Sequence, residues 1–111
     1  MSLAPLTTEA ALDAEVARGD LLLAYFSIPS CKVCKALRPR VEALLERLEV
    51  PGVFIDTTAL PETAGQRLVF AVPTLIVYGD RRELNRFGRH LALDELEDAL
   101  TRLRDLLADA G

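Results

Sequence analysis

The sequence predicts an α/β fold, with a mixed central β-sheet flanked by helices on both faces. Two continuous apolar runs, residues 21–27 and 74–78, are typical of strands buried on both sides. Helical segments separate the first strands, and this alternation favours parallel pairing. A hairpin signal at Gly79-Asp80 follows the second run and adds an antiparallel strand. The sheet is therefore expected to contain both orientations.

Four elements are expected in the N-terminal half, in the order helix, strand, helix, strand: residues 7–18, 21–27, 31–49 and 53–56. Leu12 and Val16 give the first helix an apolar stripe, and Gly19 is its predicted stop. The second helix repeats apolar residues at the helical period. Pro39 lies inside it and is expected to kink it, because proline lacks an amide donor.

Four more elements are expected in the C-terminal half, in the order helix, strand, strand, helix: residues 59–68, 74–78, 82–87 and 93–108. Pro61 suits the first turn of the weaker helix. The last helix carries leucines in steps of three and four. That stripe is too short for a sustained heptad, so it indicates core packing rather than a dimer zipper, and we expect a monomer.

Composition limits the function classes. A chain of 111 residues, half of them apolar, suits one domain spanning residues 1–111. A net charge of −4 argues against nucleic acid or an anionic membrane as the main partner. No apolar run approaches the ~20 residues of a membrane span. The first ten residues lack the pattern of a signal peptide, so we expect a cytoplasmic protein.

The two cysteines of the chain, Cys31 and Cys34, lie at the start of the second predicted helix. Helical residues three apart have Cβ atoms ~5–6 Å from one another, close to disulfide reach. Free amides and the positive partial charge of a helix N-terminus favour a thiolate. Lys32 and Lys35, the two lysines of the chain, add charge that lowers a thiol pKa, unless they fall there by chance.

A Cys-x-x-Cys pair is also typical of half a zinc site or half an iron–sulfur site. Zinc requires four ligands, and the remaining soft ligand is His90, so a metal site would need two chains. We therefore expect no metal. Beside a strand–helix–strand pattern, the spacing indicates a thioredoxin-like redox motif.

The sequence resembles the thioredoxin family over nearly its whole length. The shared features are, in chain order, Phe26, the pair Cys31 and Cys34, Lys35, Pro39, Asp56, the segment Val72-Pro73-Thr74 and Gly88. The resemblance implies a thioredoxin fold in which Pro73 is cis and faces the disulfide, rather than simply opening a strand. It also implies that the Val72 backbone binds an extended substrate segment, bordered by Gly88. Ser30 and Lys32, beside the first cysteine, complete the expected substrate contacts.

The chain departs from the family pattern in three places. The tryptophan that usually precedes the first cysteine is absent, and Lys32-Val33 replaces Gly-Pro between the cysteines. Tyr25 stands where the family commonly buries an aspartate, and Gly52 lies near the place of its partner lysine. Losing both charges avoids an unpaired buried ion. It also removes the expected proton acceptor for Cys34, leaving Tyr25 as a structural residue and a speculative proton relay.

The sequence thus favours a thiol–disulfide oxidoreductase in which Cys31 attacks and Cys34 resolves the mixed disulfide. No dissociable cofactor is expected, because the Cys31–Cys34 disulfide carries the electrons. The expected partners are disulfide-containing proteins and an external reductase or thiol donor. The alternatives are a protein-binding module that docks a partner beside Pro73, and a redox sensor. The basic hairpin, including Arg86, is interpreted as a solvated edge strand, with an acidic-substrate surface as the alternative.

Overall fold

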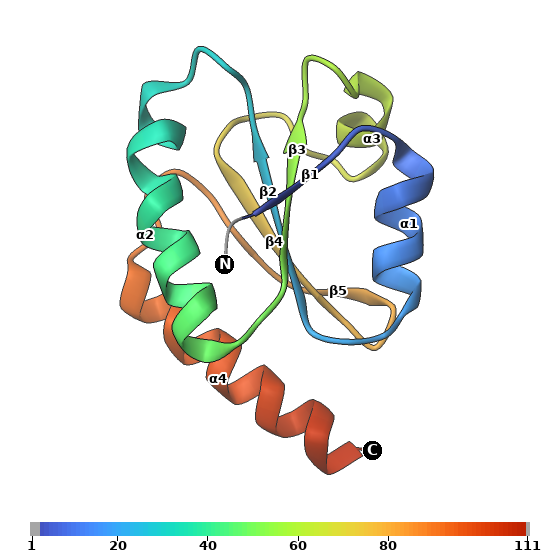
Figure 1. Ribbon diagram of the computed structural model, residues 1–111, viewed down its shortest axis with the longest axis vertical. Helices are drawn as coiled ribbons and strands as arrows, with labels where there is room; N and C mark the ends of the chain where they lie inside the picture. Colours follow the sequence, from blue (N-terminus) through green and yellow to red (C-terminus); the bar gives the residue numbers. More distant parts are fainter. Residues whose placement is uncertain (1–2, 111) are drawn as a thin grey trace.

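The computed structural model describes residues 3–110 as a five-stranded sheet, in the order β1-β3-β2-β4-β5, with helices on both faces (Figure 1). The elements are β1 (Ala4–Leu6), α1 (Glu9–Ala17), β2 (Leu22–Ser27), α2 (Lys32–Leu48), β3 (Gly52–Asp56), α3 (Pro61–Gln66), β4 (Thr74–Gly79), β5 (Arg82–Phe87) and α4 (Leu93–Ala110). β1, β3 and β2 pair in parallel, whereas β4 is antiparallel to both β2 and β5. The predicted mixed sheet is confirmed.

The first strand is a feature that the sequence analysis did not predict. β1 has three residues and lies at the sheet edge, where Pro5 does not interrupt the sheet. Before it, Leu3 is only 1% exposed, and its amide donates to the Glu42 carboxylate at 2.7 Å. The first helix begins at Glu9, later than predicted, because the Thr8 hydroxyl caps it by accepting the Ala11 amide at 3.1 Å.

The hairpin turn lies one residue later than predicted. Gly79 pairs with Arg82, and the turn is formed by Asp80 and Arg81, with φ values of 53° and 65°. Positive φ at both central residues is typical of the turn that matches the twist of hairpin strands. Gly79 stays in the strand, where a Cβ would lie 2.7 Å from the Leu84 side chain.

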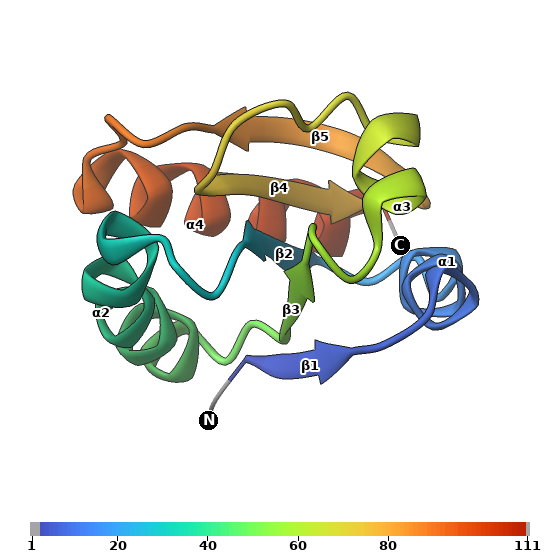
Figure 2. The ribbon, with the colours of Figure 1, turned by 90° about the horizontal axis from the view of Figure 1, so that it is seen from above.

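The core has one cluster on each face of the sheet. On one face, α2 and α4 pack against Leu23, Tyr25, Leu75 and Val77 of β2 and β4. On the other, α1 and α3 cover alternate residues of the same strands, together with those of β3. Figure 2 shows that β4 begins at the same end of the molecule as α2. The end of the sheet near the start of β4 is therefore built from strands that are buried on both faces.

Two further predictions concern helices. α2 continues through Pro39 as one helix, and the kink there stays a prediction. α4 extends to Ala110 and buries Leu96 and Leu100 completely, which confirms that its stripe packs in the core. Within residues 3–110, none of the helices has the length and apolarity needed to traverse a bilayer.

Candidate functional site

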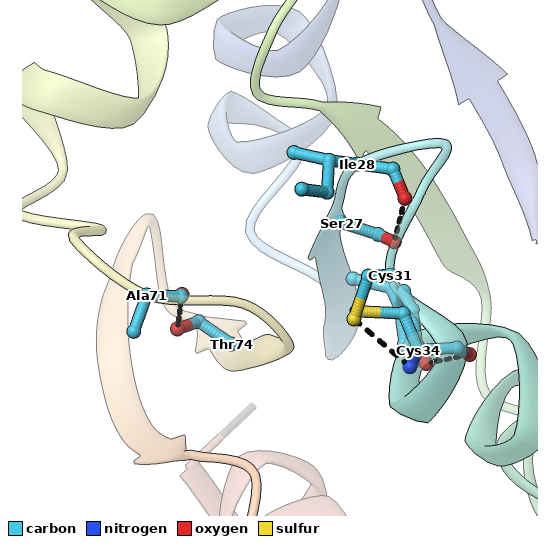
Figure 3. Close-up of a disulfide and its surroundings, with 7 residues drawn as sticks. Ser27, Ile28, Cys31, Cys34, Ala71 and Thr74 are labelled. Carbon is cyan, nitrogen blue, oxygen red and sulfur yellow. Dashed lines mark hydrogen bonds between the residues drawn. A yellow bond between two sulfur atoms is a disulfide. The ribbon is translucent and has the colours of Figure 1, made fainter.

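The two cysteines form a disulfide where β2 passes into α2 (Figure 3). Their Cα atoms are 5.2 Å apart, inside the ordinary range for a disulfide. The proximity predicted from their spacing is therefore confirmed. Cys31 is 9% exposed and Cys34 is 2% exposed, so the first cysteine is the more accessible of the two.

Cys31 is the N-cap residue of α2. Its backbone is extended, with φ −80° and ψ 107°, and its Sγ accepts the Cys34 amide at 3.1 Å. Serine, threonine, asparagine and aspartate oxygens usually occupy such a position. In the reduced protein, this amide and the helix dipole would stabilise a thiolate on Cys31 and lower the pKa of its thiol. The helix begins one residue after the predicted boundary because the cysteine caps it.

Exposed side chains surround this sulfur. Ser30, Lys32 and Val33 are all exposed, as is Lys35 one turn further along α2. Ser30 and Lys32 are thus exposed neighbours of Cys31 in the chain, and the substrate contacts that the resemblance assigns to them stay a prediction. The charges of the two lysines stand in solvent, which screens charge pairs beyond about 10 Å at moderate salt.

Tyr25 lies behind Cys34 and is completely buried. Its hydroxyl donates to the carbonyl oxygen of Cys34 at 2.6 Å. Burial raises the pKa of Tyr25 to about 12, against the opposing charge of Arg38. The phenol therefore stays neutral near pH 7, and its proton is engaged by a backbone carbonyl. This geometry makes Tyr25 a support for the first turn of α2.

Behind Tyr25 lies an aromatic and cationic layer that sequence reasoning missed. The Tyr25 ring stacks on Phe54, with centroids 6.0 Å apart and planes 18° apart. The Arg38 guanidinium carbon lies 4.2 Å from the Phe54 centroid, within cation–π range. Arg38 also pairs with Glu42 at 3.6 Å. The i, i+4 spacing of Arg38 and Glu42 was a usable signal, whereas the contact with Phe54 depends on strand register.

The place of the family's partner lysine is filled by apolar side chains. A Cβ on Gly52 would lie 2.5 Å from Leu3 and 2.6 Å from Leu45. A side chain at this position therefore requires Leu3 and Leu45 to shift. The replacement of the buried charged pair by Tyr25 and Gly52 is thus matched by the packing around both positions.

A cavity of about 250 Å³ adjoins Cys34. It is lined by Cys34, Lys35, Arg38, Phe54 and residues 27–29. Two cationic side chains and several apolar groups thus border the second cysteine. Asp56, at the end of β3, does not line this cavity; its carboxylate accepts hydrogen bonds from the amide and the hydroxyl of Thr58. Among residues 3–110, no cluster of histidine, cysteine and carboxylate side chains is suited to hold a metal ion.

The segment before β4 lies on the other side of the disulfide. The Val72–Pro73 peptide bond is cis, Pro73 is buried, and Val72 packs against the core cluster that contains both cysteines. The Thr74 hydroxyl donates to the Ala71 carbonyl at 2.7 Å. In Figure 3 the sulfur atoms point toward the segment that carries Ala71 and Thr74. Val72 and the two cysteines therefore contribute to one core cluster, and the facing of Pro73 toward the disulfide stays a prediction.

Two of the predicted positions are peripheral. Gly88, just after β5, is exposed, and a Cβ built on it meets no atom within 4 Å. Its φ is not positive, so neither close packing nor backbone conformation explains a glycine there. His90 is exposed in the same loop. The role of Gly88 at a substrate groove stays a prediction.

Comparisons with known proteins agree with this geometry. The family model described as Thioredoxin matches residues 4–102. The Thioredoxin-like protein YdfQ of Bacillus subtilis (strain 168) is 33% identical over 82 residues, which cover 71% of each chain. A thioredoxin of Chlamydia trachomatis is 36% identical over 72 residues, covering 64% of this chain and 70% of that protein.

Solved structures show the same likeness. A mutant thioredoxin from Halobacterium salinarum NRC-1 superposes with a TM-score of 0.82 at 26% identity, covering 89% of this chain and 88% of the other. Fasciola hepatica thioredoxin gives a TM-score of 0.81 at 29% identity, covering 90% of this chain and 98% of the other. With the family match over most of the sequence and a cysteine pair at the head of α2, the chain belongs to the thioredoxin family.

Proposed function

We propose that this protein is a thiol–disulfide oxidoreductase that exchanges disulfides with other proteins through Cys31 and Cys34. The observation that carries the proposal is the place of the Cys31 Sγ at the N-cap of α2, accepting the Cys34 amide at 3.1 Å. The same sulfur is bonded to Cys34, and Cys31 is the less buried of the two cysteines. A stabilised, accessible thiolate beside a second thiol is what exchange requires.

The reaction has two balanced steps. In the reduced protein, the Cys31 thiolate attacks one sulfur of a substrate disulfide, and the other substrate sulfur leaves as a thiolate. Cys34 then loses its proton to solvent and attacks the Cys31 Sγ, which breaks the mixed disulfide and releases the second substrate thiolate. The Cys31–Cys34 disulfide that forms holds the two oxidising equivalents, so no dissociable cofactor takes part.

The substrate contacts belong to the same proposal. Ser30 and Lys32 are exposed neighbours of Cys31 in the chain, Val72 packs against the core cluster that contains both cysteines, and Gly88 is exposed after β5. An extended substrate segment would lie along the Val72 backbone in the manner of an added strand. The protein would act as a monomeric domain in the cytoplasm, where a reductase or small thiol returns it to the dithiol form.

Insulin reduction tests the proposal. With excess dithiothreitol as donor, the wild-type protein should accelerate insulin reduction, and Cys31→Ser should lower the rate to that of dithiothreitol alone. Without dithiothreitol, reduced Cys34→Ser should accumulate a mixed disulfide between Cys31 and insulin that mass spectrometry detects. Undiminished catalysis by Cys31→Ser would contradict the assignment of the nucleophile.

A redox sensor is the second candidate, and the place of Tyr25 favours it. The Tyr25 hydroxyl donates to the Cys34 carbonyl, and as a neutral phenol it is not a base that takes the Cys34 proton near pH 7. Slow resolution suits a protein whose disulfide state alters partner binding more than one that turns over rapidly. The two functions separate in turnover: a sensor would form the disulfide with an oxidant but would not accelerate insulin reduction.

A further inference from the structure

Two exposed apolar side chains lie close in the chain to the cysteines and to the cis proline. Among residues 3–110, the large hydrophobic side chains exposed to solvent are Val33, Leu68, Phe70 and Leu106. Val33 stands between the two cysteines and is 44% exposed, and Phe70 precedes the Val72–Pro73 bond and is 83% exposed. Leu106 lies far along α4. Single exposed apolar residues are common, but Phe70 is the most exposed of the four and comes two positions before Val72, where the proposed function has a substrate bind.

The segment that carries Phe70 is fastened on both sides. Val69 is only 7% exposed, and its amide donates to the Ala64 carbonyl at 2.9 Å. On the other side, Thr74 holds the Ala71 carbonyl. Because its neighbours are anchored, Phe70 stands out from a held backbone and does not belong to a frayed end.

Arg86 of β5 also holds this segment through hydrogen bonds to its backbone. Its guanidinium donates to the Leu68 carbonyl at 2.8 Å and to the Arg67 carbonyl at 2.6 Å. Glu83 orients the same guanidinium through contacts of 2.9 and 2.8 Å. Leu68 itself has a φ of 57°, a conformation that an unsupported leucine rarely adopts. Arg86 therefore acts as a positioning residue for the backbone that presents Phe70.

Phe70 lies along the path of a substrate bound at Val72. Figure 2 shows the segment after α3 running to the end of the molecule where α2 begins. Phe70 comes two positions before Val72, a span of at most about 7 Å along the chain. A peptide that pairs with the Val72 backbone and continues in extended form would therefore pass the Phe70 ring, since each of its residues advances about 3.3 Å.

We propose that Phe70 is an apolar anchor that selects substrate segments with an aliphatic or aromatic side chain two or three residues from the reactive cysteine. This inference rests on the proposed function and deepens it by naming the substrate class. An apolar side chain of the substrate would cover the Phe70 ring and remove both surfaces from water. Val33 extends the same apolar rim beside the sulfurs.

Matched peptide disulfides test the anchor. Each peptide carries one cysteine joined to thionitrobenzoate, with leucine at the second and third positions after the cysteine in one peptide and serine there in the other. The reduced wild-type protein should release thionitrobenzoate from the leucine peptide about tenfold faster at limiting concentration, as expected for partial burial of one apolar contact. Phe70→Ser should abolish this preference, and Phe70→Leu should keep most of it.

The controls separate this inference from the proposed function. Leu106→Ser removes another exposed apolar side chain and should keep the preference. Hydroxyethyl disulfide has no side chain to reach Phe70, so its exchange with wild-type and Phe70→Ser protein should be equally fast. Equal rates for the two peptides with wild-type protein, or an unchanged preference in Phe70→Ser, would overturn the anchor. Failure of the wild-type protein to exchange even with hydroxyethyl disulfide would overturn the proposed function itself.

Discussion

Cys31 and Cys34 are three residues apart, yet their surroundings differ. Cys31 is 9% exposed, caps α2, and its sulfur accepts a backbone amide. Cys34 is 2% exposed and lies inside the first turn, with its carbonyl held by Tyr25. The helix cap and the larger exposed fraction therefore coincide at Cys31, which the proposed function makes the attacking cysteine, whereas Cys34 is more deeply buried.

The side facing substrate and the side facing the core also differ in chemistry. Around Cys31, the exposed residues include two lysines and Val33. Behind Cys34, Tyr25 and Phe54 form a stack that is closed by Arg38, in place of a buried carboxylate. Under the proposed function, this contrast would keep the activation of the attacking sulfur and leave the resolving one without a carboxylate as proton acceptor.

The largest effect on catalysis is expected from replacing Cys34, the more deeply buried cysteine of the pair. Cys34→Ser should still release thionitrobenzoate from a peptide disulfide in a single turnover, because Cys31 keeps its helix cap. Its steady-state insulin reduction should fall at least about a hundredfold, since the mixed disulfide then waits for an external thiol. The measurement compares the burst with the steady state. Loss of the burst along with turnover would mean that Cys34, and not Cys31, performs the first attack.

Restoring a carboxylate behind Cys34 should sharpen the contrast. Tyr25→Asp places a proton acceptor near the second sulfur, and general-base assistance typically contributes at least about a hundredfold. Because the buried site lacks a partner cation at Gly52, we expect a smaller gain of about tenfold in resolution at pH 7. Stopped-flow decay of the mixed disulfide measures this rate.

The matched control is Tyr25→Phe, which keeps the ring stack on Phe54 and removes only the hydroxyl. Its resolution rate should equal that of the wild type, because the wild-type phenol donates to a carbonyl and takes no proton. A tenfold slower resolution in Tyr25→Phe would show that Tyr25 is a proton relay after all.

Alkaline unfolding provides a third test, which concerns the buried Tyr25 phenol behind Cys34. Burial raises the pKa of Tyr25 from 10.0 to about 12, so the folded state holds this proton more tightly than the unfolded state does. The stability linked to this proton is fully present below pH 10 and is lost as the pH rises toward 12. Urea titrations at several pH values should show the free energy of unfolding declining over this window.

Tyr25→Phe should make the alkaline decline in the free energy of unfolding shallower. Part of the decline should remain, because burial also raises the pKa of Tyr78. The matched control is Tyr78→Phe, which should remove the other part. An identical alkaline decline in wild type and Tyr25→Phe would contradict the burial and hydrogen bonding of the Tyr25 phenol.

The smallest effect is expected from the exposed lysines. Lys32→Gln should raise the pKa of the Cys31 thiol by a few tenths of a unit at low salt, because solvent and ions screen an exposed charge. The pH dependence of alkylation at two ionic strengths measures this shift. If the pKa of the Cys31 thiol rose by a full unit and did so even at high salt, Lys32 would lower that pKa more than the helix cap does.

The sequence predicted the strands and helices that have long repeating patterns. The runs in β2 and β4 and the leucine stripe of α4 were identifiable because each repeats its pattern over several residues. β1 was missed because three residues, one of them Pro5, carry no period. The hairpin turn was displaced by one residue because the packing of Gly79 against Leu107 comes from a helix distant in the sequence.

The candidate site was predictable where neighbours in sequence are neighbours in space. The Cys31–Cys34 reach follows from helical spacing alone. The contact of Arg38 with Phe54 and the hold of Arg86 on the Leu68 carbonyl join residues far apart in the chain. The exposure of Phe70 was equally hidden, because an apolar residue before a strand is more often buried than presented to solvent.

The central claim is that the N-terminus of α2 makes Cys31, and not Cys34, the reactive thiolate. The most direct measurement is the pH dependence of alkylation of the reduced protein, with the modified cysteine identified by mass spectrometry. The account predicts that Cys31 is modified first, with an apparent pKa below about 7.5. Modification of both cysteines at equal rates with an apparent pKa of about 8.5, the value for a free thiol, would contradict it.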